Sequence, residues 1–370
     1  MHPIVDNALL IHQCLQTLER MDPLYKFCDQ WFFQEFSVLG ADGELPAIVE
    51  KKIVLFNELF VKRVYRKISS QLFEEHRLLF AFLLASSVMK GSQELAQEEW
   101  DFFVASQYTH VEDLRNQLEG VSDEGWRRMN PLLTRLDSME HFAGIRQHFC
   151  HNHREWMDLK AVPCPQILSK LPQKYQALSL FQKLILVKVF FPEKVLPCVE
   201  YFVQQVLGAD FMKQKEVTLK EVLAESTPST PIMLIKRQGQ SQALREFEKC
   251  AKECEMEECI LRCICCQGSY RILVSMIKRA AQEGKWVLAE ECQVEAPTVQ
   301  KIKEVLESLK TTEINSNFRL WLLTESAPFS PEFLRGCSRL VIPEHRTFQQ
   351  TLHQCYEMLP ASQFEDCLRK

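Results

Sequence analysis

The second half of the sequence alternates short apolar runs with amphipathic stretches, and this alternation restricts the fold more than any other feature. Runs of strand type occur at residues 231–235, 259–266, 285–289, 318–324 and 339–342. Between them, residues 243–257, 270–282 and 297–310 carry apolar side chains at helical spacing. Strands separated by helices form parallel sheets, because each helix returns the chain to the start of the next strand. The pattern therefore predicts a mainly parallel α/β domain.

The first part of the sequence has helical periodicity almost throughout. Apolar residues recur at helical spacing in residues 4–20, 24–40, 48–91, 114–118, 142–157, 178–191 and 197–208, with a break expected near Ser69 and Ser70. The turn-rich stretch STPSTP separates these helices from the first strand. The sequence thus predicts a mixed α/β protein with a helical domain at residues 1–185 and an α/β domain at residues 186–356. Residues 357–370 are expected to begin a further helical lid or a tail.

Composition and charge narrow the class of protein. Apolar residues make up 46% of the 370 residues, charged residues 25%, and the formal net charge is -5. The charges are spread along the chain, so neither nucleic acid nor an anionic membrane is expected as a partner. The N-terminus lacks the pattern of a signal peptide, and the 15 cysteines are irregularly spaced. Reduced thiols and a cytoplasmic location are therefore expected.

A phosphate-binding loop is not recognisable after the first predicted strand. Such loops use glycine amides around the phosphates, a lysine at the outer oxygens and a hydroxyl on Mg²⁺. The sequence after residue 235 is KRQGQSQ, in which Gly239 is the sole glycine. The pair Gly284-Lys285 enters a strand and is followed by Trp286. The chain is therefore expected to lack a catalytic residue, a cofactor and ATPase activity of its own.

Two acidic residues at a strand end support the alternative of residual nucleotide binding or ATP hydrolysis. Glu290 and Glu291 follow the apolar run at residues 286–289. A carboxylate at this place holds Mg²⁺ in phosphate-loop enzymes, and a second one can orient the attacking water. The candidates for nucleotide contact are accordingly Gly239, Glu290, Glu291 and Thr324. Solvated acids at a strand end are the favoured interpretation, since no phosphate loop accompanies them.

A cysteine-rich stretch raises a second alternative, a metal-binding module. The residues in question are Cys250, Cys254, Cys259, Cys263, Cys265 and Cys266. Zinc sites need four ligands in a compact tetrahedron, commonly from paired CxxC motifs, and no CxxC occurs in this stretch. If a metal is bound, Cys259, Cys263, Cys265 and Cys266 are the candidates. Small buried apolar side chains are the favoured interpretation.

Six segments of the sequence resemble, in order, the dynein heavy chain family. Residues 317–344 resemble the family pattern of a strand FRLWLT, a loop with Phe-Pro, a leucine and a second strand before Glu-Pro-Pro, although His345 and Arg346 replace the Pro-Pro. The matching residues are Phe318, Arg319, Leu320, Trp321, Leu322, Thr324, Glu325, Phe329, Pro331, Leu334 and Glu344. Residues 284–307 resemble the segment GxWVLLQNCHLA, with Glu290-Glu291 in place of Gln-Asn. The other segments are residues 21–36, 72–84, 181–194 and 265–280.

The resemblance implies the far C-terminal part of a dynein motor ring. Residues 1–185 would be the helical lid of the fifth AAA+ module, and residues 186–356 the degenerate, phosphate-loop-like sixth module. In the family, ATP hydrolysis belongs to earlier modules, and the microtubule-binding stalk lies outside the matched region. The resemblance thus implies a non-catalytic ring segment that takes part in microtubule-based movement or in the assembly of axonemes and cilia. Its divergence suggests an outlying family member, or a short isoform or fragment.

Partners and location follow from the same resemblance. It implies contacts with other dynein AAA+ modules, with dynein intermediate or light chains, or with axonemal proteins. No direct microtubule-binding stalk is expected in this chain. The implied location is the cytoskeleton within the cytoplasm, including the axoneme of a cilium or flagellum.

Overall fold

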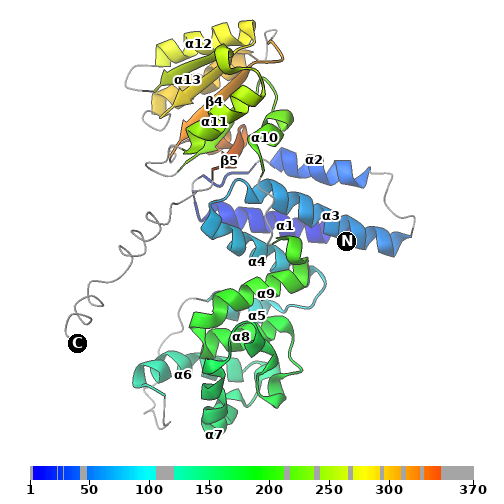
Figure 1. Ribbon diagram of the computed structural model, residues 1–370. Helices are drawn as coiled ribbons and strands as arrows, with labels where there is room; N and C mark the ends of the chain where they lie inside the picture. Colours follow the sequence, from blue (N-terminus) through cyan, green and yellow to red (C-terminus); the bar gives the residue numbers. More distant parts are fainter. Residues whose placement is uncertain are drawn as a thin grey trace, which may run out of the picture. The chain divides into compact units, whose positions relative to one another are not determined.

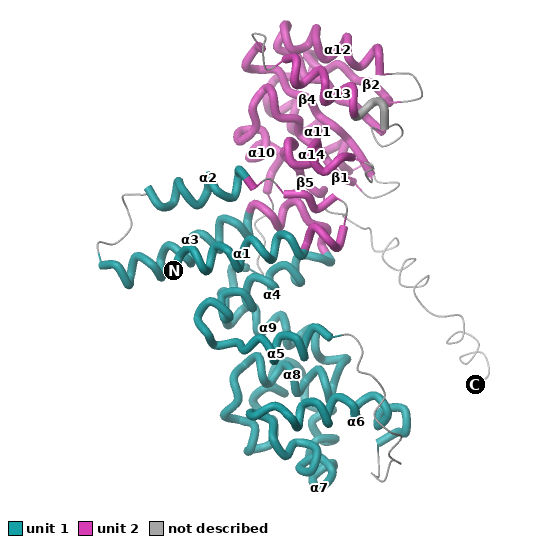
Figure 2. The backbone as a smooth tube through the Cα atoms, turned by 180° about the vertical axis from the view of Figure 1, so that it is seen from behind, with its two compact units in different colours: residues 1–17, 30–66, 75–215 teal, residues 18–29, 67–74, 216–370 magenta. Residues whose placement is uncertain are grey.

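A computed structural model gives the fold of the chain in two compact units (Figure 2). It describes residues 3–22, 24–27, 29–41, 48–105, 121–211, 217–236, 242–265, 270–291, 296–309, 314–325 and 329–342. Unit 1 comprises residues 1–17, 30–66 and 75–215, and unit 2 comprises residues 18–29, 67–74 and 216–370. The helix expected at residues 114–118 lies outside the described residues. The predicted mixed α/β class is confirmed, because unit 1 is helical and unit 2 contains a parallel sheet.

The predicted boundary at residues 185 and 186 separates modules of a larger ring and stays a prediction. Compactness is a different criterion, and it keeps the chain in unit 1 up to residue 215. The reason is local packing, because the helix at residues 180–190 contacts the helices at 97–104, 123–137 and 195–207. Compactness also assigns residues 18–29 and 67–74, from the helical part of the sequence, to unit 2.

Unit 1 is built from helices (Figure 1). Their bounds are α1 Pro3–Glu19, α2 Asp29–Gly40, α3 Val49–Ser69, α4 Glu74–Gly91, α5 Gln97–Val104, α6 Asp123–Asp137, α7 Ile145–Asp158, α8 Leu180–Phe190 and α9 Val195–Leu207. Helices α1, α2, α3 and α4 each contribute one or more end residues to unit 2. The predicted break near Ser69 and Ser70 is confirmed, since α3 ends there and α4 begins at Glu74.

Helix α8 forms the centre of the unit 1 core. It is apolar on nearly all sides, as expected of a helix surrounded by others. Ser179 and Gln182 form a capping box at its start. The backbone amide of Gln182 donates to Ser179 Oγ at 3.2 Å, and the backbone amide of Ser179 donates to Gln182 Oε1 at 2.9 Å. The Phe181 ring lies 6.2 Å from that of Phe82 and 5.7 Å from that of Phe202. These contacts join α4, α8 and α9 into one core.

The stability of unit 1 is expected to depend on pH through His148 in α7. The Trp156 indole N–H donates to His148 Nδ1 at 3.3 Å, which requires a neutral imidazole. Burial, and secondarily the charge of Lys174, lowers the pKa of His148 below its ordinary value of 6.5, although Glu155 opposes the shift. Above pH 6.5 both the folded and the unfolded chain hold this histidine neutral. As the pH falls below 6.5 the unfolded chain takes up the proton first, so the free energy of unfolding must fall.

Urea unfolding of wild type and His148→Phe between pH 5 and pH 8 tests this expectation. The variant is expected to lose the part of the acid-induced destabilisation that begins near pH 6.5. His151→Phe is the matched control, because exposed His151 lies on the same helix and bonds only the Gln147 carbonyl oxygen in the described structure. Identical pH profiles for wild type and His148→Phe would contradict the assignment.

Unit 2 contains a five-stranded parallel sheet in the order β2-β3-β4-β1-β5. Its strands are β1 Ile232–Ile235, β2 Ile260–Ile264, β3 Trp286–Glu290, β4 Arg319–Thr324 and β5 Ser338–Val341. Its helices are α10 Leu219–Glu225, α11 Gln242–Glu253, α12 Tyr270–Glu283, α13 Ala296–Leu309 and α14 Pro331–Arg335. All five strands expected from the sequence are confirmed.

Helices cover both faces of this sheet (Figure 1). On one face α10 and α11 pack on alternate residues of four strands, including Ile232, Trp286, Trp321 and Leu340. The intervening residues, such as Val287, are also buried and point to the other face, because side chains alternate along a strand. There α12 contacts β2 and β3 as well as α13. Burial on both faces explains why these strands are continuous apolar runs.

Residues 24–27 correct the predicted helix at residues 24–40. The helix begins only at Asp29, and residues 24–27 are not helical. Asp22 Oδ1 accepts the Leu24 amide at 2.8 Å, and Glu19 Oε1 accepts the Phe27 amide at 3.0 Å. These side chains satisfy amides that a helix would otherwise use. The aromatic spacing in this stretch reflects burial within unit 2, not helical periodicity.

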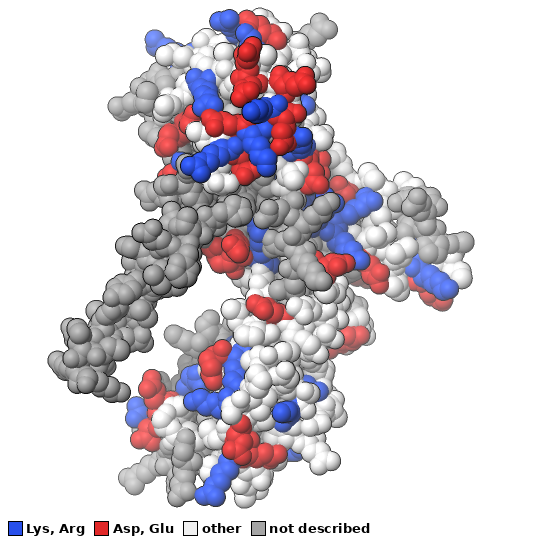
Figure 3. All heavy atoms as spheres, viewed as in Figure 1, with Lys and Arg blue, Asp and Glu red and all other residues white. Residues whose placement is uncertain are grey.

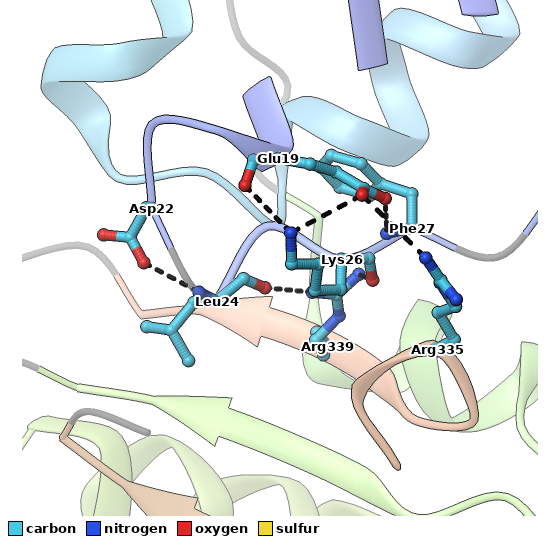
Figure 4. A network of polar contacts seen from close by, with 7 residues as sticks. All are labelled: Glu19, Asp22, Leu24, Lys26, Phe27, Arg335 and Arg339. Atoms are coloured by element: carbon cyan, nitrogen blue, oxygen red, sulfur yellow. Dashed lines mark hydrogen bonds and ion pairs between the residues drawn. The ribbon is translucent and has the colours of Figure 1, made fainter. Parts of the chain in front are cut away.

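Segments 18–29 and 67–74 contact the edge strand β5. Arg339 on β5 is 5% exposed and donates to the carbonyl oxygens of Leu24 and Lys26, while its guanidinium lies 5.2 Å from the centre of the Phe27 ring (Figure 4). The Val341 amide donates to the Ser70 carbonyl oxygen at 3.0 Å. The edge of the sheet is therefore partly closed by residues far away in the sequence. Closure of this kind protects an edge strand from pairing with another chain.

The described surface has mixed charge, and none of the described helices is long and apolar enough to cross a membrane. On the face of unit 2 seen in Figure 3, basic and acidic side chains alternate over short distances. Unit 2 also contains the ion pairs Lys220–Glu253 and Arg262–Glu248, with N–O distances of 2.9 Å and 2.7 Å. This mixture agrees with the even spread of charge along the sequence.

Candidate functional site

The carboxyl ends of β1, β3 and β4 form the candidate site. All strands are parallel, so their carboxyl ends lie at the same edge of the sheet. From β1 the chain proceeds to β2 at the far edge, and β4 lies between β3 and β1. Open α/β sheets bind ligands beyond the carboxyl ends of strands where the strand order reverses, and phosphate-loop proteins bind their nucleotide just after the first strand.

Lys236, the residue after β1, lies at the centre of this site. Its backbone amide donates to the Thr324 carbonyl oxygen at 2.9 Å, which continues the pairing of β1 with β4 by one residue. Its side chain is 13% exposed, and Nζ lies 2.9 Å from Glu325 Oε1 and 3.7 Å from Glu291 Oε1. We call Lys236, Glu291 and Glu325 the strand-end cluster. One ammonium thus bridges carboxylates from the ends of two other strands.

The two adjacent acids of the sequence have different positions. Glu290 is the last residue of β3, and its carbonyl oxygen accepts the Cys265 amide at 2.8 Å, so its backbone belongs to the sheet. Glu291 has a φ of 59°, a left-handed conformation that is uncommon for residues other than glycine. The chain turns at this residue, and the Glu291 carboxylate reaches Lys236. The two acids therefore do not act as a matched pair in the described structure.

The other candidates for nucleotide contact are placed as follows. Thr324 is 0% exposed at the end of β4, paired in register with Ile235. Gly239, together with Arg237, lies outside the described residues. Of these four candidates, only Glu290 and Glu291 are described with surface exposure. Lys236 and Glu325, which the structure brings together, were not among the predicted site residues.

The cysteines predicted as possible metal ligands are dispersed or buried. Cys263 and Cys265 are buried, Cys259 is half-buried outside β2, and Cys266 lies outside the described residues. Burial, and secondarily neighbouring Cys254, raises the pKa of Cys250 to about 12, which keeps it a thiol and not a metal-binding thiolate. Among the described residues, no three histidine, cysteine or acidic side chains are grouped closely enough to hold a metal ion.

The strand-end cluster favours internal charge pairing over anion binding. A lysine that serves a nucleotide must reach phosphate oxygens, and a carboxylate that serves Mg²⁺ must face the metal. Here the lysine lies between two carboxylates, and Glu290 adds a third acidic group at the same edge. Any phosphate that approached Lys236 would compete with Glu325 at 2.9 Å and meet the repulsion of the surrounding acids.

Substitution of Lys236 tests whether the strand-end cluster stabilises unit 2. We expect Lys236→Met to lower the free energy of unfolding of unit 2 by about 1 kcal/mol, because Glu291 and Glu325 would face each other without a cation in a half-buried site. Lys301→Met is the control, since the Lys301–Glu304 pair is about half exposed and its loss should not be measurable. Urea unfolding at low and high salt measures both. No change for Lys236→Met at low salt would contradict a stabilising role.

Comparison with known proteins relates this chain to one family. Residues 227–341 match the protein-family model described as Dynein heavy chain region D6 P-loop domain. Mouse dynein axonemal heavy chain 1 is 24% identical over 368 residues, which is 99% of this chain and 8% of that protein. A Chlamydomonas reinhardtii protein, the dynein-1-beta heavy chain of the flagellar inner arm I1 complex, is 24% identical over 372 residues, with the same coverage. Rat dynein axonemal heavy chain 12 is 26% identical over 299 residues, or 80% of this chain and 10% of that protein.

The region matched by the family model contains the whole sheet on which the candidate site lies. It begins at residue 227, before β1, and ends at residue 341, the last residue of β5, so it contains all five strands. The chain spans about a tenth or less of the length of these relatives. Nearly the whole chain is therefore similar to a part of the dynein heavy chains, and residues 227–341 are similar to their region D6 P-loop domain, which supports a correspondence to the C-terminal part of the motor region.

Proposed function

We propose that this chain is a non-catalytic structural segment of a dynein-type motor ring. The observation that carries the proposal is the strand-end cluster, in which Glu291 and Glu325 engage Lys236 where a phosphate-loop protein would bind its nucleotide. The five strands form a continuous parallel sheet with helices packed on both faces. The sheet is thus complete as a packing unit, while the charged groups at its carboxyl edge pair with one another.

Exposed apolar side chains support a role that involves neighbours. In unit 1, Phe33 and Val38 on α2 are each 61% exposed. In unit 2, Ile264 at the end of β2 and Ile272 on α12 are 66% and 62% exposed. Adjoining AAA+ modules or dynein-associated chains would cover such surfaces. The chain expressed alone is accordingly proposed to self-associate or to require a partner for solubility.

The relatives extend the proposal to a place in the cell. Their names include axonemal heavy chains and a flagellar inner arm complex. We propose by analogy that this chain acts in microtubule-based movement or in axoneme assembly, in contact with other dynein modules and with dynein intermediate or light chains. Fractionation of ciliated cells that carry a tagged chain tests this part. The tagged chain should follow axonemal dyneins through high-salt extraction.

Nucleotide binding decides between the proposal and its enzymatic alternative. A ligand at about 100 times its Kd stabilises the folded state by roughly 2.7 kcal/mol, a shift of several degrees in the melting temperature. We expect millimolar Mg-ATP to leave the melting temperature of the full chain unchanged. We also expect any phosphate release to be equal in wild type, Glu290→Gln and Glu291→Gln. A reproducible shift with Mg-ATP, or turnover that either substitution abolishes, would favour the residual ATPase instead.

A further inference from the structure

The segment between α10 and β1 contains the triplet Ser-Thr-Pro twice, at residues 226–228 and 229–231, in two different structural settings. Each triplet offers a threonine hydroxyl followed by proline. In an unfolded chain the two would be nearly equivalent. In the fold the two threonines differ in exposure and in backbone contacts, and these differences affect how easily an enzyme can modify each of them.

Thr227 is exposed at the first position of a β-turn. The Thr230 amide donates to the Thr227 carbonyl oxygen at 3.0 Å, and Pro228 occupies the second position, where its fixed φ is favourable. The Thr227 hydroxyl oxygen lies 2.7 Å from that of Thr230 and 3.1 Å from that of Ser229. One backbone hydrogen bond and two solvent-exposed hydroxyl contacts hold this turn, so opening it at Thr227 costs less than detaching a strand from the sheet.

Thr230 is held more firmly by the sheet. Its amide closes the turn, and its own side chain is half-buried. The next residue, Pro231, is buried and accepts the Ser338 amide at 2.9 Å, which ties it to the start of β5. A kinase that needs Thr230-Pro231 in its active site must therefore detach the beginning of the sheet.

The neighbourhood of Thr227 also contains a cation suited to a phosphate. Arg319 Nε donates to Ser226 Oγ at 2.9 Å, and Nη2 donates to the Ser226 carbonyl oxygen at 3.3 Å. Its Nη1 donates to the carbonyl oxygens of Ser316 and Phe318, each at 2.7 Å. All these acceptors are uncharged, so a dianion one residue beyond Ser226 would meet a guanidinium that its described hydrogen bonds do not neutralise.

We propose that Thr227 is a phosphorylation site for proline-directed protein kinases, and that Thr230, in the same sequence context, is not. In the reaction Thr227 Oγ1 attacks the γ-phosphorus of ATP, and the bond from that phosphorus to the β,γ-bridging oxygen breaks. ADP leaves with that oxygen, and the hydroxyl proton passes to the catalytic carboxylate of the kinase. The product carries a phosphate beside the hydroxyls of Ser229 and Thr230, both able to donate to it.

The test is phosphorylation of the folded full chain by a proline-directed kinase of the cyclin-dependent class with ATP, followed by mass-spectrometric mapping. We expect incorporation to approach one phosphate per chain at Thr227, with labelling of Thr230 at least about tenfold slower. Thr227→Val should remove this incorporation, whereas Thr230→Val should leave it. A peptide of residues 222–235 is the reference in which both threonines are accessible.

The peptide makes each outcome informative. If the kinase labels the peptide but leaves the folded chain unlabelled, Thr227 is not a site and the proposal fails. Equal labelling of Thr227 and Thr230 in the folded chain would also overturn it, because the sheet would then give no protection. Circular dichroism of each threonine variant confirms that the chain is folded when it is assayed.

Discussion

We expect the Arg339→Ala variant to lose about 3–5 kcal/mol from the free energy of unfolding of unit 2. Arg339 is 5% exposed on the edge strand β5, and it donates to the carbonyl oxygens of Leu24 and Lys26. Hydrogen bonds from charged donors are worth roughly 1.5–3 kcal/mol each, and their loss leaves buried acceptors without partners. The stacking of the guanidinium on Phe27 would be lost as well. Hydrogen exchange of the β1 and β5 amides measures the effect locally.

A neighbouring arginine supplies the control for this prediction. Arg335 on α14 is 43% exposed, and its Nη2 lies 3.9 Å from Glu19 Oε2 (Figure 4). Arg335→Ala should change the free energy of unfolding by no more than about 0.5 kcal/mol, because the pair is long and partly solvated. Arg339→Lys should fall between wild type and Arg339→Ala, since one ammonium replaces a fork that reaches two carbonyl oxygens. Faster exchange in Arg335→Ala than in Arg339→Ala would contradict the assigned roles.

The same contacts mark the limit of what local sequence patterns predict in this chain. Helices and strands with strong periodicity, such as β3, β4 and α12, were predicted to within a few residues. Residues 24–27 were predicted as helix because their aromatic spacing resembles a buried helical face. Their conformation depends on the nearby acceptors Asp22 and Glu19 and also on Arg339, more than 300 positions away in the sequence. No window of neighbouring residues contains the contribution of Arg339.

The candidate site was predictable only in part, because it also depends on contacts between residues far apart in the sequence. The sequence placed Glu290 and Glu291 at a strand end, and the structure has them there. Which strand ends lie next to one another depends on the strand order, and the alternation of helix and strand does not specify it. Lys236 and Glu325 become partners only because β1 lies beside β4 in the order β2-β3-β4-β1-β5. The positive φ of Glu291, which separates it from Glu290, has no sequence signal comparable to a glycine.

The second large effect is expected from Trp321→Ala, which should lower the free energy of unfolding of unit 2 by about 3–5 kcal/mol. The Trp321 side chain is 0% exposed in the middle of β4, with its ring 5.2 Å from that of Trp286 and 5.1 Å from that of Phe247. Alanine would leave a large cavity between the sheet and α11. Urea unfolding followed by the exchange of β4 amides measures the loss.

Substitution with phenylalanine separates the size of this side chain from its polarity. In the described part of the chain the Trp321 indole N–H is buried without an acceptor, whereas the Trp286 indole N–H donates to the Asn317 carbonyl oxygen at 3.2 Å. Trp321→Phe removes an unsatisfied donor along with volume, so it should recover more than half of the loss seen with alanine. Trp286→Phe gives up a hydrogen bond and lacks this compensation. A Trp321→Phe variant as unstable as Trp321→Ala would show that the ring contacts are not the main source of stability.

The Trp321 and Lys236 variants together distinguish two roles of the sheet, packing against neighbouring modules and binding a ligand. Trp321 lies in the core, and Lys236 lies in the strand-end cluster. If the chain acts by packing against neighbouring modules, Trp321→Ala should abolish its recovery with other dynein chains from ciliated cells, whereas Lys236→Met should leave that recovery intact. A nucleotide-dependent role gives a different result, because Lys236→Met would then weaken recovery in a folded protein. Retained recovery of a destabilised Trp321→Ala chain would place the binding surface outside unit 2.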